Sequence, residues 1–139
     1  MHIFAVIDTN VLVSAMLKKD SVPHRVIEKI FDGTVTVVIS EEILAEYGEV
    51  LSRPRFGFQK DDVRRTIQGF MYRGIKLNGI SVPDGETMPD PKDIAFYEVT
   101  LDARQTRETY LVTGNGKHFP VKPFVVTPAE MLEIIEKNC

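Results

Sequence analysis

The stretch IFAVIDTNVL (residues 3–12) decides the fold, because an apolar run in it ends directly on a carboxylate. The continuous apolar run over 3–7 predicts a strand buried on both faces, as in the centre of a parallel sheet. A helical pattern then predicts a helix over 9–18. Asp8 lies between them, at the carboxyl end of the strand, where open α/β sheets bind their ligands. Asp8 is therefore well placed for metal or phosphate chemistry. Taken alone, it fits equally an Asp that only caps the following helix, since Asp is a favoured N-cap residue.

Strands and helices alternate along the rest of the chain. Ser40 is predicted to cap a helix, and the capping box of residues 127–130, with Pro128 at the first helical position, is predicted to begin the last helix. The alternation predicts an α/β fold, a three-layer α/β/α sandwich with a mostly parallel central sheet, as one domain over 1–139. Further elements are expected as helices over about 22–32, 41–52, 60–73 and 91–104, strands over 34–39, 109–113 and 124–126, and a loop over 77–89 with at most a short strand.

Composition narrows the class of protein. The 139 residues are 43% hydrophobic, which is enough for a sizeable core. The only cysteine is Cys139, so no intramolecular disulfide and no Cys-rich metal site is expected. The N-terminal apolar run is too short for a signal peptide, and no stretch approaches the roughly 20 apolar residues of a membrane span. We expect a cytoplasmic protein that makes no membrane contact.

The formal net charge of -3 conceals a basic window over residues 53–76. This window holds seven basic and two acidic residues, a net of +5, so the rest of the chain carries -8. Basic residues interleaved with aromatic ones suit a groove that follows a single-stranded nucleic acid and stacks its bases. A solvated helix face over a few core aromatics fits the same pattern equally well. The candidate RNA contacts are Arg53, Arg55, Arg64 and Arg65.

Glu46 is the acid of the helix over 41–52 that lies nearest its apolar face. At about 100° per residue, Glu46 falls about 40° outside the apolar arc, against about 80–100° for Glu42 and Glu49. We expect Glu46 to be partly buried, where a carboxylate needs a partner or a cation. An ordinary salt bridge at the boundary of the core would satisfy it as well.

Two more acids stand one turn apart in DPKD, residues 90–93. Asp90 is predicted to cap a helix that opens at Pro91, and Asp93 complements the dipole of its first turn. The two carboxylates could also share a metal ion. Asn115 repeats the placement of Asp8 after another buried strand, whereas His118 is expected to be a surface or packing residue.

In combination these segments resemble the PIN-domain nucleases and, within that family, the VapC-like toxins of prokaryotic toxin–antitoxin systems. The resemblance runs in the family's order and spacing through VIDTNVLVSAML, SEEILAEYGEVLSRP, DPKDIAFYEVTLDA, YLVTGNGKHFP and VVTPAEMLEII. It implies a compact α/β/α domain, frequent homodimers, an antitoxin as protein partner, and Mg²⁺- or Mn²⁺-dependent endonuclease activity, usually on RNA.

The resemblance also implies roles for individual acids. Asp8, Glu46 and Asp93 match the first, second and third acids of the family. Asp90 matches an extra acid of related sequences. Asn115 stands where many relatives have a fourth Asp, which leaves the number of tightly held metal ions open.

Polar neighbours complete the implied site. Thr9, Asn10 and Thr113 match positions that orient the acids or the attacking water. The implied function is a metal-dependent endoribonuclease that acts as the toxin component of a type II toxin–antitoxin system. In this interpretation Glu46 positions the water or holds a second metal ion.

Two rival interpretations remain. A phosphatase with Asp8 as covalent nucleophile commonly needs a partner acid two residues later, and that position is Asn10. A catalytically weak or inactive module that keeps the fold to bind RNA or a protein partner is favoured by Asn115.

Overall fold

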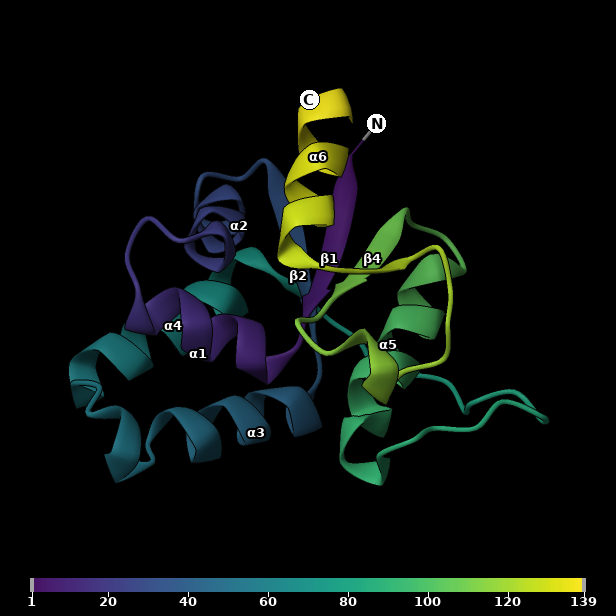
Figure 1. Cartoon of the computed structure of the whole chain (residues 1–139), viewed down its shortest axis with the longest axis horizontal. Coiled ribbons are helices and arrows are strands. Elements are labelled where there is room, and N and C mark those ends of the chain that lie inside the picture. The colour runs from purple at the N-terminus through teal and green to yellow at the C-terminus, as the bar shows by residue number, and fades with distance from the viewer. Residues whose placement is uncertain (1, 139) are drawn as a thin grey trace.

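The computed structural model describes residues 2–138, so Cys139 lies outside the described residues. A five-stranded sheet runs through it, and every strand pairs parallel to its neighbours in the order β3-β2-β1-β4-β5 (Figure 1). The strands are β1 (Ile3–Ile7), β2 (Val35–Ile39), β3 (Ile75–Lys76), β4 (Thr109–Val112) and β5 (Val125–Val126). The prediction of a parallel sheet around residues 3–7 is confirmed.

Strand β1 occupies the centre because its residues can be buried on both faces. Ile3 and residues 5–7 are 0% exposed. Ala5 is in register with Val37 of β2 on one side and with Tyr110 of β4 on the other. The carboxyl ends of these strands therefore meet at one edge of the sheet.

Helices cover both faces of the sheet. The chain moves from β1 to β2 and β3 in one direction and then returns to β4, so right-handed connections place α5 on the face opposite the earlier helices. In agreement, α5 packs on β1, β2 and β4, whereas α2 packs on β2 and contacts α4 and α6 (Figure 1). This is the predicted α/β/α sandwich. The helices are α1 (Thr9–Leu17), α2 (Val22–Phe31), α3 (Glu41–Leu51), α4 (Lys60–Arg73), α5 (Ile94–Arg104) and α6 (Pro128–Asn138).

Most of the predicted helix starts are confirmed by side-chain hydrogen bonds. The hydroxyl of Ser40 accepts from the amide of Ile43 at 3.2 Å. At the start of α6 the side chains of Thr127 and Glu130 accept from each other's amides at 3.1 and 2.9 Å. These caps depend only on neighbouring residues, which is why the sequence predicts them.

The prediction that an α-helix begins at Pro91 is wrong for the first turn. Residues Pro91–Asp93 form a 3₁₀ helix, η2, and α5 begins only at Ile94. The amide of Asp93 donates to the carbonyl of Asp90 at 3.1 Å, and this three-residue spacing tightens the turn. Two further 3₁₀ turns, η1 (Pro54–Phe56) and η3 (Gly116–His118), were not expected. Among residues 2–138 we find no helix with the length and apolar character needed to cross a membrane.

Tyr47 fastens α3 to the end of β1. It is 0% exposed, and its hydroxyl donates a hydrogen bond of 2.5 Å to the carbonyl oxygen of Ile7. Its ring lies against those of Phe70 and Phe96, with centroids 5.8 and 6.3 Å apart. Because Asp8 follows Ile7 and Glu46 precedes Tyr47, this contact fixes two acidic residues relative to each other.

We expect Tyr47→Phe to lower the free energy of unfolding by about 1–3 kcal/mol, because it removes the donor of a buried hydrogen bond. Urea denaturation followed by circular dichroism measures the change. The control is Tyr110→Phe, since the hydroxyl of this half-buried residue donates to the side chain of Glu108, just before the strand, at 3.2 Å. The control should lose less than about 0.5 kcal/mol, and equal losses in both variants would contradict the role given to Tyr47.

Candidate active site

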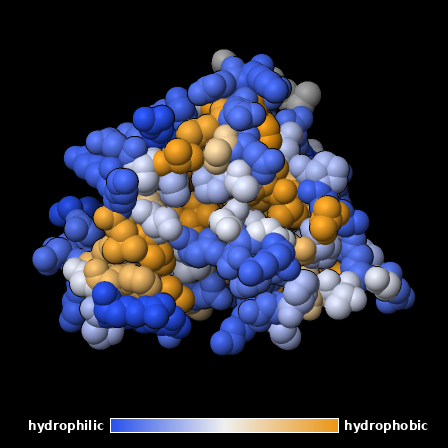
Figure 2. Space-filling view, viewed as in Figure 1, coloured by the Kyte–Doolittle hydropathy of each residue, from blue (hydrophilic) through white to orange (hydrophobic). Residues whose placement is uncertain are grey.

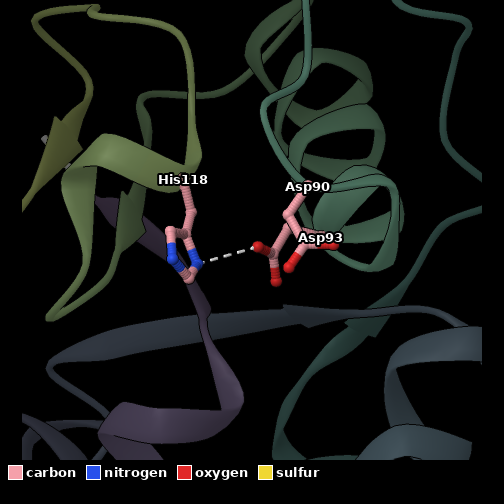
Figure 3. A group of neighbouring side chains, drawn as sticks. All are labelled: Asp90, Asp93 and His118. Atoms are coloured by element: carbon pink, nitrogen blue, oxygen red, sulfur yellow. Dashed lines mark ion pairs between the residues drawn. The ribbon is translucent and has the colours of Figure 1, made fainter.

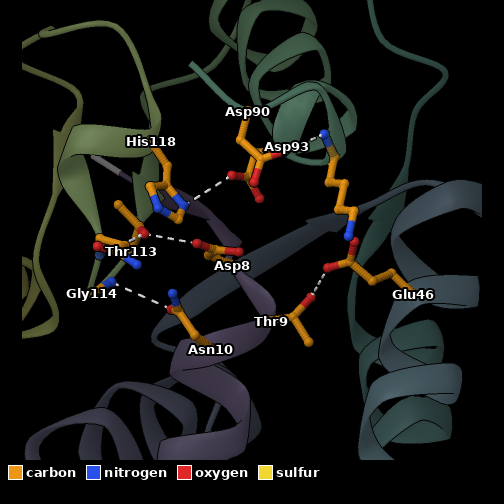
Figure 4. A network of polar contacts seen from close by, with 11 residues as sticks. Asp8, Thr9, Asn10, Glu46, Asp90, Asp93, Thr113, Gly114 and His118 are labelled. Atoms are coloured by element: carbon orange, nitrogen blue, oxygen red, sulfur yellow. Dashed lines mark hydrogen bonds and ion pairs between the residues drawn. The ribbon is translucent and has the colours of Figure 1, made fainter. Parts of the chain in front are cut away.

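A pocket of about 400 Å³ opens at the carboxyl edge of the sheet. Four carboxylates from three parts of the chain line it, and Figure 4 shows their side chains turned toward a common space. Asp8 follows β1, Glu46 lies on α3, Asp90 precedes η2 and Asp93 ends it. Thr9 and Asn10 also line the pocket. Parallel strands place ligand sites at this edge, so the location agrees with the architecture.

Asp8 is the most buried of these acids, with 4% exposure. Its carboxylate accepts a hydrogen bond of 2.7 Å from the hydroxyl of Thr113, at the end of β4. That hydroxyl in turn accepts from the amide of Asn115 at 3.0 Å. Within the described residues, the Asp8 side chain makes no capping hydrogen bond to α1. Asp8 occupies the N-cap position of α1 as predicted, and its carbonyl accepts from the amide of Val11 at 3.0 Å, but its carboxylate is held by the neighbouring strand rather than by the helix.

Glu46 lies at the opposite wall of the pocket, on α3. It is half-buried, whereas Glu42 and Glu49 of the same helix are exposed, as the helical periodicity predicts. The hydroxyl of Thr9 donates a short hydrogen bond to its carboxylate (Figure 4). Thr9 therefore links Glu46 to the turn that carries Asp8.

Asp90 and Asp93 approach His118 across the pocket (Figure 3). One donor atom from each of the three side chains lies within 4.8 Å of the other two. Nδ1 of His118 is 3.2 Å from Oδ2 of Asp93. Among residues 2–138 this buried oxygen has no partner that meets full hydrogen-bond geometry, and the imidazole of His118 beside it counteracts part of the rise in the pKa of Asp93.

The structure brings His118 to the site and leaves the side chain of Asn115 outside the described lining. His118 was expected to be a surface or packing residue, and its partly exposed side chain lies at the pocket, 3.2 Å from Asp93, a placement that the sequence did not predict. The turn η3 carries it back over the pocket, and Phe119, 2% exposed, anchors that turn in the core. The feature of the sequence that could have indicated this placement is the aromatic residue directly after the histidine in KHFP, because a buried Phe119 fixes the backbone beside His118. Asn115 meets the site through its backbone amide.

Basic and aromatic residues form the outer wall of the pocket. Arg53, Arg55 and Phe56 line it where α3 passes into η1, and Lys92 lines it from η2. The guanidinium of Arg55 lies 4.8 Å from the centre of the Phe56 ring. Arg64 and Arg65 are on α4, in exposed ion pairs with Asp61 and Asp62, and are not among the described residues that line this pocket.

Burial and mutual repulsion make this group of acids unfavourable when all are ionised. Burial raises the pKa of Asp8 to about 6 against the lowering effect of the Thr113 hydrogen bond, and the charges of Asp93 and Glu46 add to the rise. Burial also raises the pKa of Glu46 and that of Asp93. A cation would relieve this repulsion and would give the buried Asp93 oxygen a partner. The donor set therefore fits a divalent metal ion.

Comparison with known families agrees with this geometry. A family model described as PIN domain matches residues 5–117, about four-fifths of the chain. The matched segment contains all four acids of the pocket and ends one residue before His118. Comparisons with curated proteins and with solved structures found no match.

We expect Asp8→Asn to stabilise the metal-free protein at neutral pH. The pKa of Asp8 is about 6 in the folded state against 3.8 ordinarily, so the folded state binds this proton more tightly than the unfolded chain does. Ionisation of Asp8 therefore lowers the free energy of unfolding as the pH rises from about 4 to about 6, by on the order of 2–3 kcal/mol. Asparagine can still accept from Thr113 but carries no charge.

Urea unfolding in the presence of a chelator, from about pH 4 to about pH 7, measures the difference between variant and wild type. The advantage of Asp8→Asn should grow with pH and then level off. Glu42→Gln, which neutralises an exposed carboxylate of α3, is the control. An advantage that stays constant over this range would contradict the assignment of a buried, ionising Asp8.

Proposed function

The chain belongs to the PIN domain family, whose members are generally metal-dependent nucleases, and from this we propose that it is a Mg²⁺- or Mn²⁺-dependent endoribonuclease. The observation that carries the proposal is the buried Asp8, held by Thr113 at the end of the central strand with Asp93 and Glu46 facing the same pocket. Acids grouped in this way fit a cation and a phosphodiester substrate.

The proposed division of labour follows burial and position. Asp8, Asp93 and Asp90 hold the metal ion. A bound Mg²⁺ or Mn²⁺ supplies charge neutralisation at the phosphate and a lowered pKa of water. Glu46, oriented by the Thr9 hydroxyl and partly open to the pocket, accepts a hydrogen bond from the attacking water and fixes its direction. Asn10, whose side-chain oxygen lies 3.5 Å from the amide of Gly114, keeps the two strand-end turns together.

The outer wall supports RNA as the substrate in this proposal. Arg53 and Arg55 offer cationic donors to the phosphates on either side of the scissile bond. Phe56 lies beside them and offers a ring on which an unpaired base can stack. A single strand can present both groups at once, whereas the paired bases of a duplex are not free to stack.

We extend the proposal to a biological role as the toxin of a type II toxin–antitoxin system, with a cognate antitoxin and a homodimeric assembly. The motif order of the VapC-like toxins supports it. An apolar surface over α1 and α4, ringed by hydrophilic side chains in Figure 2, also supports a protein partner. A pocket of about 470 Å³ there is lined in part by Leu12, Met16, Ile27 and Phe58.

We expect Asp8→Asn to abolish metal-dependent cleavage of a labelled single-stranded RNA, with a loss of about 100-fold or more, while circular dichroism shows an intact fold. Glu42→Gln should cleave like the wild type. Undiminished cleavage by Asp8→Asn would overturn the proposed function. If the wild type neither cleaves RNA nor binds Mn²⁺ by isothermal titration, the chain is a non-catalytic binding module instead.

We expect the double variant Arg53→Ala/Arg55→Ala to weaken RNA binding about tenfold or more. The slope of log K against log salt concentration should fall by an amount that corresponds to about one to two lost phosphate contacts. Fluorescence anisotropy with a labelled single strand measures both quantities, in an Asp8→Asn background to prevent cleavage. Arg64→Ala/Arg65→Ala removes the same charge from α4 and should have a smaller effect. A larger effect of the α4 variant would contradict this prediction and would indicate that the RNA binds along α4 rather than along the pocket wall.

A further inference from the structure

We propose that His118 is a nitrogen ligand of the metal ion, together with Asp90 and Asp93, and that it shifts the preference of the site from Mg²⁺ toward first-row transition ions such as Mn²⁺. The inference rests on the proposed function only in requiring that a divalent cation binds in this pocket. It concerns a donor that lies beyond the segment matched by the PIN domain model.

The geometry of the three donors carries the inference. Their ligand atoms lie within 4.8 Å of one another. In an octahedral site with bonds of about 2.1 Å, neighbouring ligands lie about 3.0 Å apart and opposite ligands about 4.2 Å apart, so side-chain movements of about 1–2 Å would close the three donors around one ion. Asp90 and Asp93 come from one side of the pocket and His118 from the other, as Figure 3 shows. A cation between them would join the two sides.

The contact between His118 and Asp93 leaves a buried carboxylate oxygen without a well-aligned partner. Nδ1 lies 3.2 Å from Oδ2, at the long end of the range for a hydrogen bond. Within residues 2–138, that buried oxygen has no partner that meets full hydrogen-bond geometry. A cation between the two groups would give this oxygen the well-placed partner that the imidazole does not supply. An ion pair evolved only for stability would be expected to align its donor with the oxygen.

The backbone that carries the imidazole is also held in place before any ion binds. His118 ends η3, and its amide donates to the carbonyl of Asn115 at 2.9 Å. The next residue, Phe119, is 2% exposed and anchors the turn. An anchored donor loses little conformational entropy when it binds a ligand.

The chemistry of the donor predicts the preference. Mg²⁺ takes oxygen ligands and retains its waters. Imidazole nitrogen suits transition ions better, and affinity for mixed nitrogen and oxygen sites rises along the first row from Mn²⁺. His118 therefore supplies a donor that discriminates between ions that carboxylates alone bind similarly.

The test is electron spin echo spectroscopy of the full chain loaded with Mn²⁺. We expect modulation from an imidazole ¹⁴N in the wild type and its loss in His118→Ala. Titration calorimetry should show Mn²⁺ binding weakened about tenfold or more in His118→Ala, with a smaller change for Mg²⁺. The control is His24→Ala, which removes a histidine that lines the separate apolar pocket and should leave the ¹⁴N signal unchanged.

The opposite result is equally clear. If His118 only neutralises Asp93, wild-type Mn²⁺ shows no ¹⁴N modulation and His118→Ala binds both ions as tightly as the wild type or more tightly. Bound Mn²⁺ without a nitrogen signal would overturn this inference while leaving the proposed nuclease intact. A nitrogen signal with no RNA cleavage would support the ligand and overturn the nuclease. Absence of Mn²⁺ binding would overturn both.

Discussion

The burial of the Asp8 carboxylate is the constraint on which the site depends. A carboxylate with 4% exposure loses most of its hydration, and three further acids line the same pocket. The hydroxyl of Thr113 compensates only part of this cost, because the pKa of Asp8 remains raised to about 6. The fold therefore stores an unfavourable electrostatic arrangement that a cation can relieve, which is the usual condition of a metal-binding acid.

The parallel sheet makes this arrangement mechanically possible. Strand β1 is buried on both faces and is paired on both edges, so the residue that follows it has little freedom. The hydroxyl of Tyr47 binds the last carbonyl of that strand and positions α3 across the end of the sheet. Asp8 and Glu46 are thus positioned by the core. The remaining donors, Asp90, Asp93 and His118, lie at or beside the 3₁₀ turns η2 and η3.

What the sequence could predict follows from the range of each interaction. Three predictions that depend on local sequence are confirmed: the caps at Ser40 and Thr127 and the half-burial of Glu46. The two caps involve residues only three positions apart, and the burial of Glu46 follows from helical periodicity. Asp8 stands at the N-cap of α1 as predicted, but among the described residues its side chain makes no capping bond, because Thr113, 105 residues away, binds the carboxylate. His118 escaped prediction for the same reason, since its partner Asp93 belongs to a different segment.

The charges of the pocket also determine how a cation and a polyanion influence each other. Four carboxylates and three permanent cations, Arg53, Arg55 and Lys92, line it, a net charge of -1 when all the acids are ionised and His118 is counted as neutral. One divalent ion changes this to +1. Under the proposed function, a phosphate is therefore repelled by the empty pocket and attracted by the loaded one. By linkage, RNA must raise the affinity for the metal ion by the same factor by which the ion raises the affinity for RNA. The acids at the base of the pocket and the arginines on its wall then act as one coupled site.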